Sequence, residues 1–191
     1  MTAGHMRAIF ALDPGGSSGL AWGVFDTSPD LTVAEAMRSR LHADSTTVVG
    51  DEYEQIKLIA TFWMTFYREC VYERLLDPQA VEFVCEDFVQ RPGPTPGGKE
   101  GQSPIRIMWG VEGYRMGRAD EFKGRKINSK ARIHAPRMIL QLPSDSSAYG
   151  TKQRLKDWNC WVVGREHERS AWKHVALRVA RIQRLQLSSG T

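Results

Sequence analysis

The sequence predicts an α/β fold, a mixed β-sheet with helices packed against it, in a single domain. Short β-rich segments come first, a long segment with helical periodicity follows, and strand-like and helix-like segments then alternate. The 191 residues, 41% of them hydrophobic, suffice for one core but not for two large lobes. No internal repeat divides the chain, so we expect residues 1–191 to form one domain.

Three neighbouring strands are expected near the N-terminus. The runs MRAIFAL (6–12) and GLAWGVFD (19–26) are short, β-rich and bounded by turn residues. The segment LTVAEAMRSRL (31–41) is interpreted as a third strand, with TSPD (27–30) forming the turn before it. The chain therefore begins as a meander of adjacent strands.

The period of the apolar residues then changes from that of a strand to that of a helix. Apolar side chains from Tyr53 to Val71 recur at helical spacing, which predicts a long amphipathic helix over 52–76. AVEFVCEDF (80–88) returns as a buried strand. The segment 89–104 contains four prolines and four glycines and is predicted to be a flexible loop within the domain.

The C-terminal half continues the alternation. We expect a helix over 105–118, a strand over 135–142, a short helix over 152–158 and a final helix over 166–187.

Composition limits the function classes. The apolar stretches fall short of the roughly 18 to 20 residues that span a membrane, and the N-terminus lacks the layout of a signal peptide, so we expect a soluble, cytoplasmic protein with no membrane partner. Cys70, Cys85 and Cys160 are odd in number and set among apolar residues, so we expect reduced core thiols. The net charge of +4 is compatible with a polyanionic partner or with an ordinary solvated surface.

Two acidic residues stand at the ends of predicted strands. Asp13 follows the first strand directly and precedes Pro-Gly-Gly, a turn tight enough to leave its carboxylate accessible. Glu86 lies in an apolar strand, where an unpaired charge is costly. Two converging carboxylates repel each other, and a divalent metal relieves that repulsion. The alternatives are a turn-forming role for Asp13 and a salt bridge for Glu86.

The order of these motifs resembles that of a known family. IFALDPGGSSGLAWGVFD, a third strand, a long helix, VEFVCEDF and HERSAWKHVALRVARI are together similar to the RuvC-type Holliday-junction resolvases, particularly their phage-encoded relatives, within the RNase H-like superfamily. The resemblance spans nearly the whole chain. It implies a five-stranded mixed sheet flanked by helices, a homodimer, and Mg²⁺-dependent cutting of branched DNA such as four-way junctions, with Mn²⁺ as a substitute.

The resemblance also implies site residues. Asp13 matches the first-strand aspartate and Glu86 the fourth-strand glutamate, with His167 as a third metal ligand or proton carrier. The family commonly has a pattern such as His-x-x-Asp at the start of the last helix, but here Ser170 holds the aspartate position. Glu168 supplies the missing catalytic carboxylate only if it precedes the first helical turn, because a residue one position after His167 is otherwise turned about 100° away.

His174 and Trp109 are assigned structural roles in preference to functional ones. His167, Ser170 and His174 fall on one helical face, and His174 is interpreted as a partly buried helix residue. Trp109 is assigned to the helix core or a dimer interface in preference to stacking on an unpaired base.

The expected chemistry is hydrolysis of a phosphodiester that leaves a 5′ phosphate, promoted by metal-bound carboxylates and a histidine at the edge of the site. Basic side chains then contact the DNA backbone, and binding weakens as salt rises. The candidates are Lys99, Arg106, Arg115, Lys126, Lys130, Arg132, Lys152 and Arg154.

Two other functions stay open. DPGGSSGLAWG also resembles the phosphate-binding turn of actin-like kinases and ATPases, although these need two lobes and a second Asp-x-Gly turn that this chain lacks. A DNA-junction-binding module that has kept the fold with weakened catalysis is the third interpretation, and Ser170 favours it. Metal-dependent cleavage and ATP binding distinguish the three.

Overall fold

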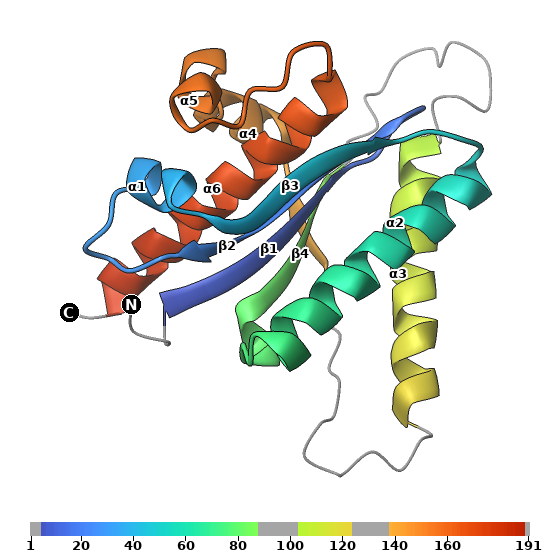
Figure 1. The fold of residues 1–191 in the computed structure, drawn as a ribbon. Helices are drawn as coiled ribbons and strands as arrows, with labels where there is room; N and C mark the ends of the chain where they lie inside the picture. The colour runs from blue at the N-terminus through green and yellow to red at the C-terminus, as the bar shows by residue number, and fades with distance from the viewer. Residues whose placement is uncertain (1–4, 88–102, 124–137, 190–191) are drawn as a thin grey trace.

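The computed structural model describes residues 5–87, 103–123 and 138–189, and these residues form a five-stranded sheet with helices on both faces (Figure 1). The strands are β1 (Met6–Asp13), β2 (Ser18–Asp26), β3 (Leu41–Val48), β4 (Val81–Glu86) and β5 (Met138–Gln141). The helices are α1 (Val33–Arg38), α2 (Glu52–Arg68), α3 (Ser103–Lys123), α4 (Pro143–Tyr149), α5 (Lys152–Asp157) and α6 (Glu166–Ser189).

The sheet is mixed, in the order β3-β2-β1-β4-β5. Strands β1, β2 and β3 are successively antiparallel, whereas β4 is parallel to both β1 and β5. The predicted α/β fold, with a five-stranded mixed sheet flanked by helices, is confirmed. Because β1 and β4 are parallel neighbours, their carboxyl ends lie at the same edge of the sheet, and the pairing of Leu12 with Cys85 brings the following residues, Asp13 and Glu86, together.

Both faces of β1 are buried, which explains its nearly continuous apolar sequence. Helices α2 and α3 cover one face, and α1, α4, α5 and α6 lie on the other (Figure 1). Under α2, an aromatic cluster fills the core: Phe10 stacks on Phe83 at 5.5 Å between ring centroids, and Trp63 meets Phe83 edge-on at 5.0 Å. The other face carries smaller residues such as Ala11 and Ala21, against which Trp172 of α6 is buried.

The prediction of a third strand over 31–41 is wrong. Most of that segment forms α1, and β3 begins only at Leu41. Thr32 accepts a hydrogen bond from the backbone N–H of Glu35, and the Glu35 carboxylate accepts one from the N–H of Thr32, which closes a capping box. Local capping with burial of Ala36 and Met37 therefore favours a helix over the strand that the apolar residues indicated.

Other element boundaries differ by a few residues. The helix expected over 52–76 consists of α2 followed by a π-helical turn (Glu69–Glu73), and α4, which begins with Pro143 at its first turn, was not predicted. The final helix was predicted well, since α6 spans Glu166–Ser189. The loop over 89–104 lies outside the described residues except for its last two positions, which begin α3.

The three cysteines are buried free thiols, as predicted. In the part of the chain that the structure describes, no helix combines the length and the hydrophobicity needed to cross a bilayer. Trp109 is 60% exposed on α3, which excludes the helix-core assignment; its assignment to a dimer interface stays a prediction.

Candidate active site

The site is centred on two carboxyl groups, Asp13 at the end of β1 and Glu86 at the end of β4. Asp13 is only 9% exposed, so the tight turn after it does not leave it as accessible as predicted, but it still borders a surface cleft. Burial, the negative charge of Glu86 and a hydrogen bond to Glu86 raise the pKa of Asp13 to about 8. Without a metal, the Asp13 carboxyl group is therefore driven toward its protonated form at neutral pH.

Glu86 is held from the other side by His174 of α6. The His174 Nε2 atom lies 2.9 Å from Glu86 Oε2. Burial alone would raise the pKa of Glu86, but the hydrogen bond and the charge of His174 outweigh burial and lower it. The two carboxyl groups are thus driven toward opposite protonation states, and Glu86 carries the negative charge.

His174 is fully buried in a polar cluster beneath the site. Its Nδ1 atom lies 3.0 Å from Gln141 Oε1 at the end of β5, and its Nε2 atom lies 3.3 Å from the Ser146 hydroxyl of α4. The interpretation of His174 as a partly buried helix residue is therefore wrong, because it contacts the site directly. The predicted helical phase was informative: His174 shares a face with His167 and Ser170, both of which also reach the site.

His167 and Ser170 approach Asp13 from the first turns of α6. His167 Nδ1 is 3.4 Å from Asp13 Oδ2, a long contact, and 44% of the His167 side chain is exposed to the cleft. The Ser170 hydroxyl group lowers the pKa of Asp13 against the larger effect of burial, and Ser170 lines the same cleft as Asp13. Ser170 is therefore part of the site as a neutral polar group.

A glycine in β2 allows the start of α6 to lie directly on the sheet. A Cβ atom at Gly19 would be 2.0 Å from the carbonyl oxygen of His167 and 2.8 Å from the backbone nitrogen of Glu168. Any side chain at position 19 would therefore push α6 outward. The close approach at Gly19 sets the depth at which His167 faces Asp13.

The turn after Asp13 is fixed by a buried glutamine that the sequence did not single out. Gln55 of α2 accepts a hydrogen bond from the Ser18 hydroxyl at 2.7 Å, and its amide donates to the carbonyl oxygens of Gly16 and Gly50, each at 3.0 Å. These bonds tie the turn to α2 and to the end of β3. Gln55 lies four residues before Ile59, in phase with the buried face of α2, so helical spacing could have indicated its burial; its polar side chain excluded it from a pattern of apolar residues.

The prediction of Glu168 as a catalytic residue is wrong. Its carboxylate is buried and accepts hydrogen bonds from Ser45 at 2.8 Å, Thr47 at 3.0 Å and Arg165 at 3.1 Å. Because α6 already begins at Glu166, residue 168 is turned away from the face that carries His167. Glu168 anchors β3 to α6 and does not contact Asp13.

The predicted DNA-binding residues have separate outcomes. Arg115 is 1% exposed, pairs with Glu112 and lies over the rings of Trp63 and Phe83, so it is a core residue and the prediction for it is wrong. Four candidates lie outside the described residues: Lys99, Lys126, Lys130 and Arg132.

Three candidates remain at the described surface. The half-exposed side chain of Arg106 lies 3.5 Å from Glu52. Lys152 and Arg154 are exposed on α5, where Lys152 lies over the Trp161 ring and Arg154 over the Tyr149 ring. Lys152 also borders the same cleft as Asp13, which favours its assignment to a backbone phosphate.

The cleft beside Asp13 has a volume of about 450 Å³ and lies between α4, α5 and the start of α6. Its lining combines acidic, basic and neutral polar groups: Asp13, Ser147, Gly150, Thr151, Lys152, Trp161, Glu166, His167, Arg169, Ser170 and Lys173. A polar cleft bordered by a carboxyl group and by basic side chains suits an anionic substrate such as a phosphate ester.

The donor set fits a hard divalent cation. Asp13 and Glu86 both offer oxygen donors, and the charge of Glu86 raises the pKa of Asp13 in addition to the effect of burial; a cation such as Mg²⁺ would neutralise both carboxylates. Among the residues that the structure describes, no three His, Cys, Asp or Glu side chains converge as a metal-binding group. Asp13 and Glu86 would therefore be the carboxylate ligands of such a cation, and a ligand role for His167 stays a prediction.

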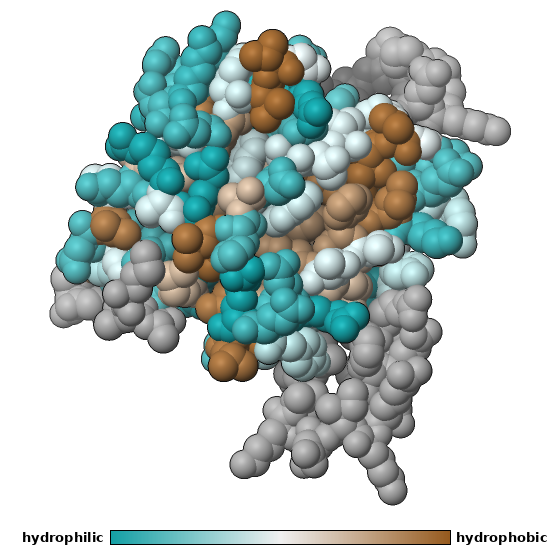
Figure 2. Space-filling view, in the orientation of Figure 1, coloured by the Kyte–Doolittle hydropathy of each residue, from teal (hydrophilic) through white to brown (hydrophobic). Residues whose placement is uncertain are grey.

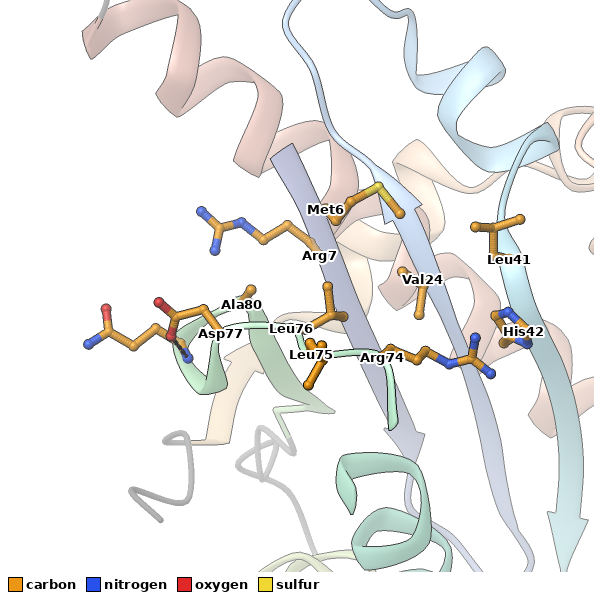
Figure 3. A pocket seen from close by; sticks show the side chains of 11 residues that line it. Met6, Arg7, Val24, Leu41, His42, Arg74, Leu75, Leu76, Asp77 and Ala80 are labelled. Atoms are coloured by element: carbon orange, nitrogen blue, oxygen red, sulfur yellow. Dashed lines mark hydrogen bonds between the residues drawn. The ribbon is translucent and has the colours of Figure 1, made fainter. Parts of the chain in front are cut away.

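A larger cavity, of about 530 Å³, lies at the opposite end of β1 (Figure 3). Met6, Val24, Leu41 and Leu76 form apolar parts of its wall, and Arg74 extends toward His42 there while pairing with Glu69. It contains no pair of carboxylates, and the length of β1 separates it from Asp13.

Comparisons with known proteins identify only distant structural neighbours. No protein-family model matches the chain, and no curated protein does. Its fold is similar to the solved structure of Thermus thermophilus RuvC in complex with a Holliday junction substrate, with 13% identity, a TM-score of 0.49, and coverage of 92% of this chain and 96% of that one. A second structure of Thermus thermophilus RuvC matches with the same identity and coverage and a TM-score of 0.48. Because the identity is low, the function proposed below is derived from this chain's own residues.

Proposed function

We propose that the protein is a metal-dependent, structure-selective endonuclease that cuts branched DNA such as four-way junctions, in the manner of a Holliday-junction resolvase. One observation carries the proposal: Asp13 and Glu86, at the ends of parallel neighbouring strands, lie at the same edge of the sheet, and Asp13 borders an open polar cleft. Burying two acids against each other destabilises the metal-free protein, which is expected where the pair has a functional role.

Asp13 and Glu86 would hold Mg²⁺, or Mn²⁺ as a substitute. A cation bound there supplies a Lewis acid that activates water and neutralises charge on the phosphate. His174 keeps Glu86 ionised and oriented through its 2.9 Å hydrogen bond, in the way that groups behind a ligand commonly position it.

The reaction is hydrolysis of a phosphodiester. A water oxygen forms a bond to phosphorus, the bond from phosphorus to the 3′ oxygen breaks, and the products are a 3′ hydroxyl and a 5′ phosphate. His167, partly exposed beside Asp13, orients the attacking water and accepts its proton, while the departing 3′ oxygen takes a proton from solvent.

Branched DNA would be contacted by the basic residues around the cleft, with Lys152 on a phosphate near the scissile one and Arg154 farther along α5. A homodimer belongs to the proposal because two cuts across a junction need two sites.

Exposed hydrophobic side chains are candidates for the contact between the two subunits. They reach the surface over β3 and α2 (Figure 2), where Leu58 is 45% and Phe62 38% exposed, and Trp109 is exposed on α3. We place the protein in the cytoplasm, of a bacterial host if it is phage-encoded.

A junction-binding module with weakened catalysis is the second candidate, favoured by Ser170 at the position of an expected acid. The deciding experiment incubates a labelled four-way junction, a linear duplex and a fork with the protein in Mg²⁺, Mn²⁺ or EDTA. Paired, metal-dependent nicks confined to the junction support the resolvase. Tight, salt-sensitive binding without cutting in any metal supports the binding module instead.

The Asp13→Asn variant is the control for the site. It should bind the junction as the wild type does and cut it at least about 1,000-fold more slowly, because one of the two metal ligands is lost. Equal cutting by the variant would remove the basis of the proposal.

A further inference from the structure

Lys173 of α6 is a positively charged residue at the carboxylate pair that no expected role accounts for. It is half-buried and lines the cleft together with Asp13, His167 and Ser170. Its charge acts on both acids, since it lowers the pKa of Asp13 and the pKa of Glu86 against the larger effect of burial on each. Lys173 and Asp13 therefore border the same cleft, where the positive charge of Lys173 faces the space in which a phosphate would lie.

The position of Lys173 is constrained by a glycine at the end of α4. A Cβ atom at Gly150 would be 2.6 Å from Lys173 Cγ, 2.8 Å from its Cβ and 2.9 Å from its Cα. Gly150 has a φ of −87°, which other residues also adopt, so space and not backbone conformation requires glycine here. The stem of Lys173 thus packs directly on α4, which limits where its ammonium group can lie.

The acids around the site do not suffice for two divalent cations. Ser170 is neutral, and Glu168 is committed to Ser45, Thr47 and Arg165. Within the described residues, no three His, Cys, Asp or Glu side chains are arranged as a metal-binding group. His174 already bonds to Glu86 and Gln141, and His167 makes only a long contact of 3.4 Å with Asp13. A second dication would be held mainly by neutral groups and would lie near the positive charge of Lys173, which repels it.

We propose that this centre binds one divalent cation, at Asp13 and Glu86, and that the Lys173 ammonium group supplies the second positive charge to the scissile phosphate. The inference rests on the proposed function and identifies a catalytic residue within it. Lys173 acts by charge on a non-bridging phosphate oxygen; it forms or breaks no covalent bond and transfers no proton. Fixed charges directed at developing charge are among the largest contributions to such catalysis.

Metal binding tests the proposal independently of cleavage. Titration of the protein with Mn²⁺, followed by electron paramagnetic resonance and calorimetry, should give one ion per chain for the wild type. Lys173→Gln should also bind one ion, about 3- to 10-fold more tightly, because a repulsive charge is removed. Lys156→Gln, on the exposed surface of α5, is the matched control and should leave stoichiometry and affinity unchanged.

Cleavage tests the second half of the proposal. At saturating Mn²⁺, Lys173→Gln should cut the junction about 100-fold more slowly, Lys173→Arg should recover part of that loss, and Lys156→Gln should cut as the wild type does. Near-ultraviolet circular dichroism checks that each variant is folded. A purely structural role for Lys173 would lower stability without tightening Mn²⁺ binding, and that result overturns the inference.

The remaining outcomes are equally decisive. Two Mn²⁺ ions per wild-type chain overturn the inference. It is also overturned if the folded, metal-saturated Lys173→Gln variant cuts the junction at the same rate as the wild type. If the wild type binds one Mn²⁺ and cuts no DNA, the proposed function fails; tighter binding by Lys173→Gln would then still uphold the placement of the ammonium group at a one-ion centre.

Discussion

Replacing Asp13 by Asn should stabilise the metal-free protein at neutral and mildly alkaline pH. The folded protein holds the Asp13 proton up to a pKa of about 8, whereas the carboxyl group ordinarily ionises at 3.8. Unfolding therefore releases a proton at any pH between these values, and the stability of the wild type falls as the pH rises through that window. Asn resembles the protonated acid: its amide donates to Glu86 and its oxygen accepts from Ser170, and it does not titrate.

The size of the effect follows from the pKa difference. Each pH unit between about 4 and 8 costs the wild type at most about 1.4 kcal/mol, so the upper bound at pH 8 is about 6 kcal/mol. Since relaxation of the cleft and entry of water offset part of this penalty, we expect a gain of about 2–4 kcal/mol for Asp13→Asn at pH 8. Below about pH 4 the gain should vanish, because Asp13 is then protonated in both the folded and the unfolded chain.

Urea denaturation in EDTA, followed by tryptophan fluorescence at several pH values from 4 to 8, measures this difference. Trp63 and Trp172 are buried and will report unfolding. Asp30→Asn, an exposed aspartate in the turn before α1, is the matched control and should show no such gain. The reasoning is refuted if Asp13→Asn is no more stable than the wild type at pH 8, or if its advantage does not shrink as the pH falls.

Four further predictions follow, two for residues around the site and two for the buried cysteines. Gly19→Ala should destabilise the protein by about 2–3 kcal/mol in urea denaturation, because its Cβ would be 2.0 Å from the His167 carbonyl oxygen, whereas Gly16→Ala, with no atom within 4 Å, should be nearly neutral. His174→Gln should weaken Mn²⁺ binding about 10- to 100-fold by calorimetry, since Glu86 loses the partner that keeps it ionised; unchanged affinity would show that His174 only fills space. Burial raises the pKa of Cys70 to about 12 and that of Cys160 to about 11, so both thiols should resist a disulfide reagent at pH 8 until urea is added, and rapid reaction of the folded protein would contradict their burial. The same shifts should lower stability as the pH rises above about 9, when the unfolded thiols ionise first.

The two carboxylates could be found from the sequence because each lies at the end of an apolar strand, where an unpaired charge is costly. The chain order of the strands then placed them at one edge of the sheet, and β1 and β4 are indeed parallel neighbours. Periodicity could not predict whether a polar side chain faces the core or the solvent. The sequence predicts Arg115 as a DNA-contacting surface residue, whereas its guanidinium group packs over Trp63 and Phe83 in the core.

The errors on α6 have the same physical origin. A difference of one position in the start of the helix decides whether Glu168 faces Asp13 or β3, and the sequence does not fix helix starts to that accuracy. His174 is as buried as the apolar residues around it, so a pattern of burial alone assigns it to the core. Its contact with Glu86 depends on the depth at which α6 packs on the sheet, which is a tertiary property.

That depth is set by two glycines on different elements. Because Gly19 of β2 has no side chain, the backbone of α6 packs directly on it at His167. Gly150, after α4, likewise allows the backbone and side-chain stem of Lys173 in α6 to pack directly on it. Between these contacts lie the residues of α6 that reach the carboxylates: His167, Ser170, Lys173 and His174. A chain that kept Asp13 and Glu86 but carried larger residues at positions 19 and 150 would hold α6 away from the sheet. Such a chain would retain the acids and lose the groups that set their protonation and balance their charge, so the glycines are as informative about this site as the acids are.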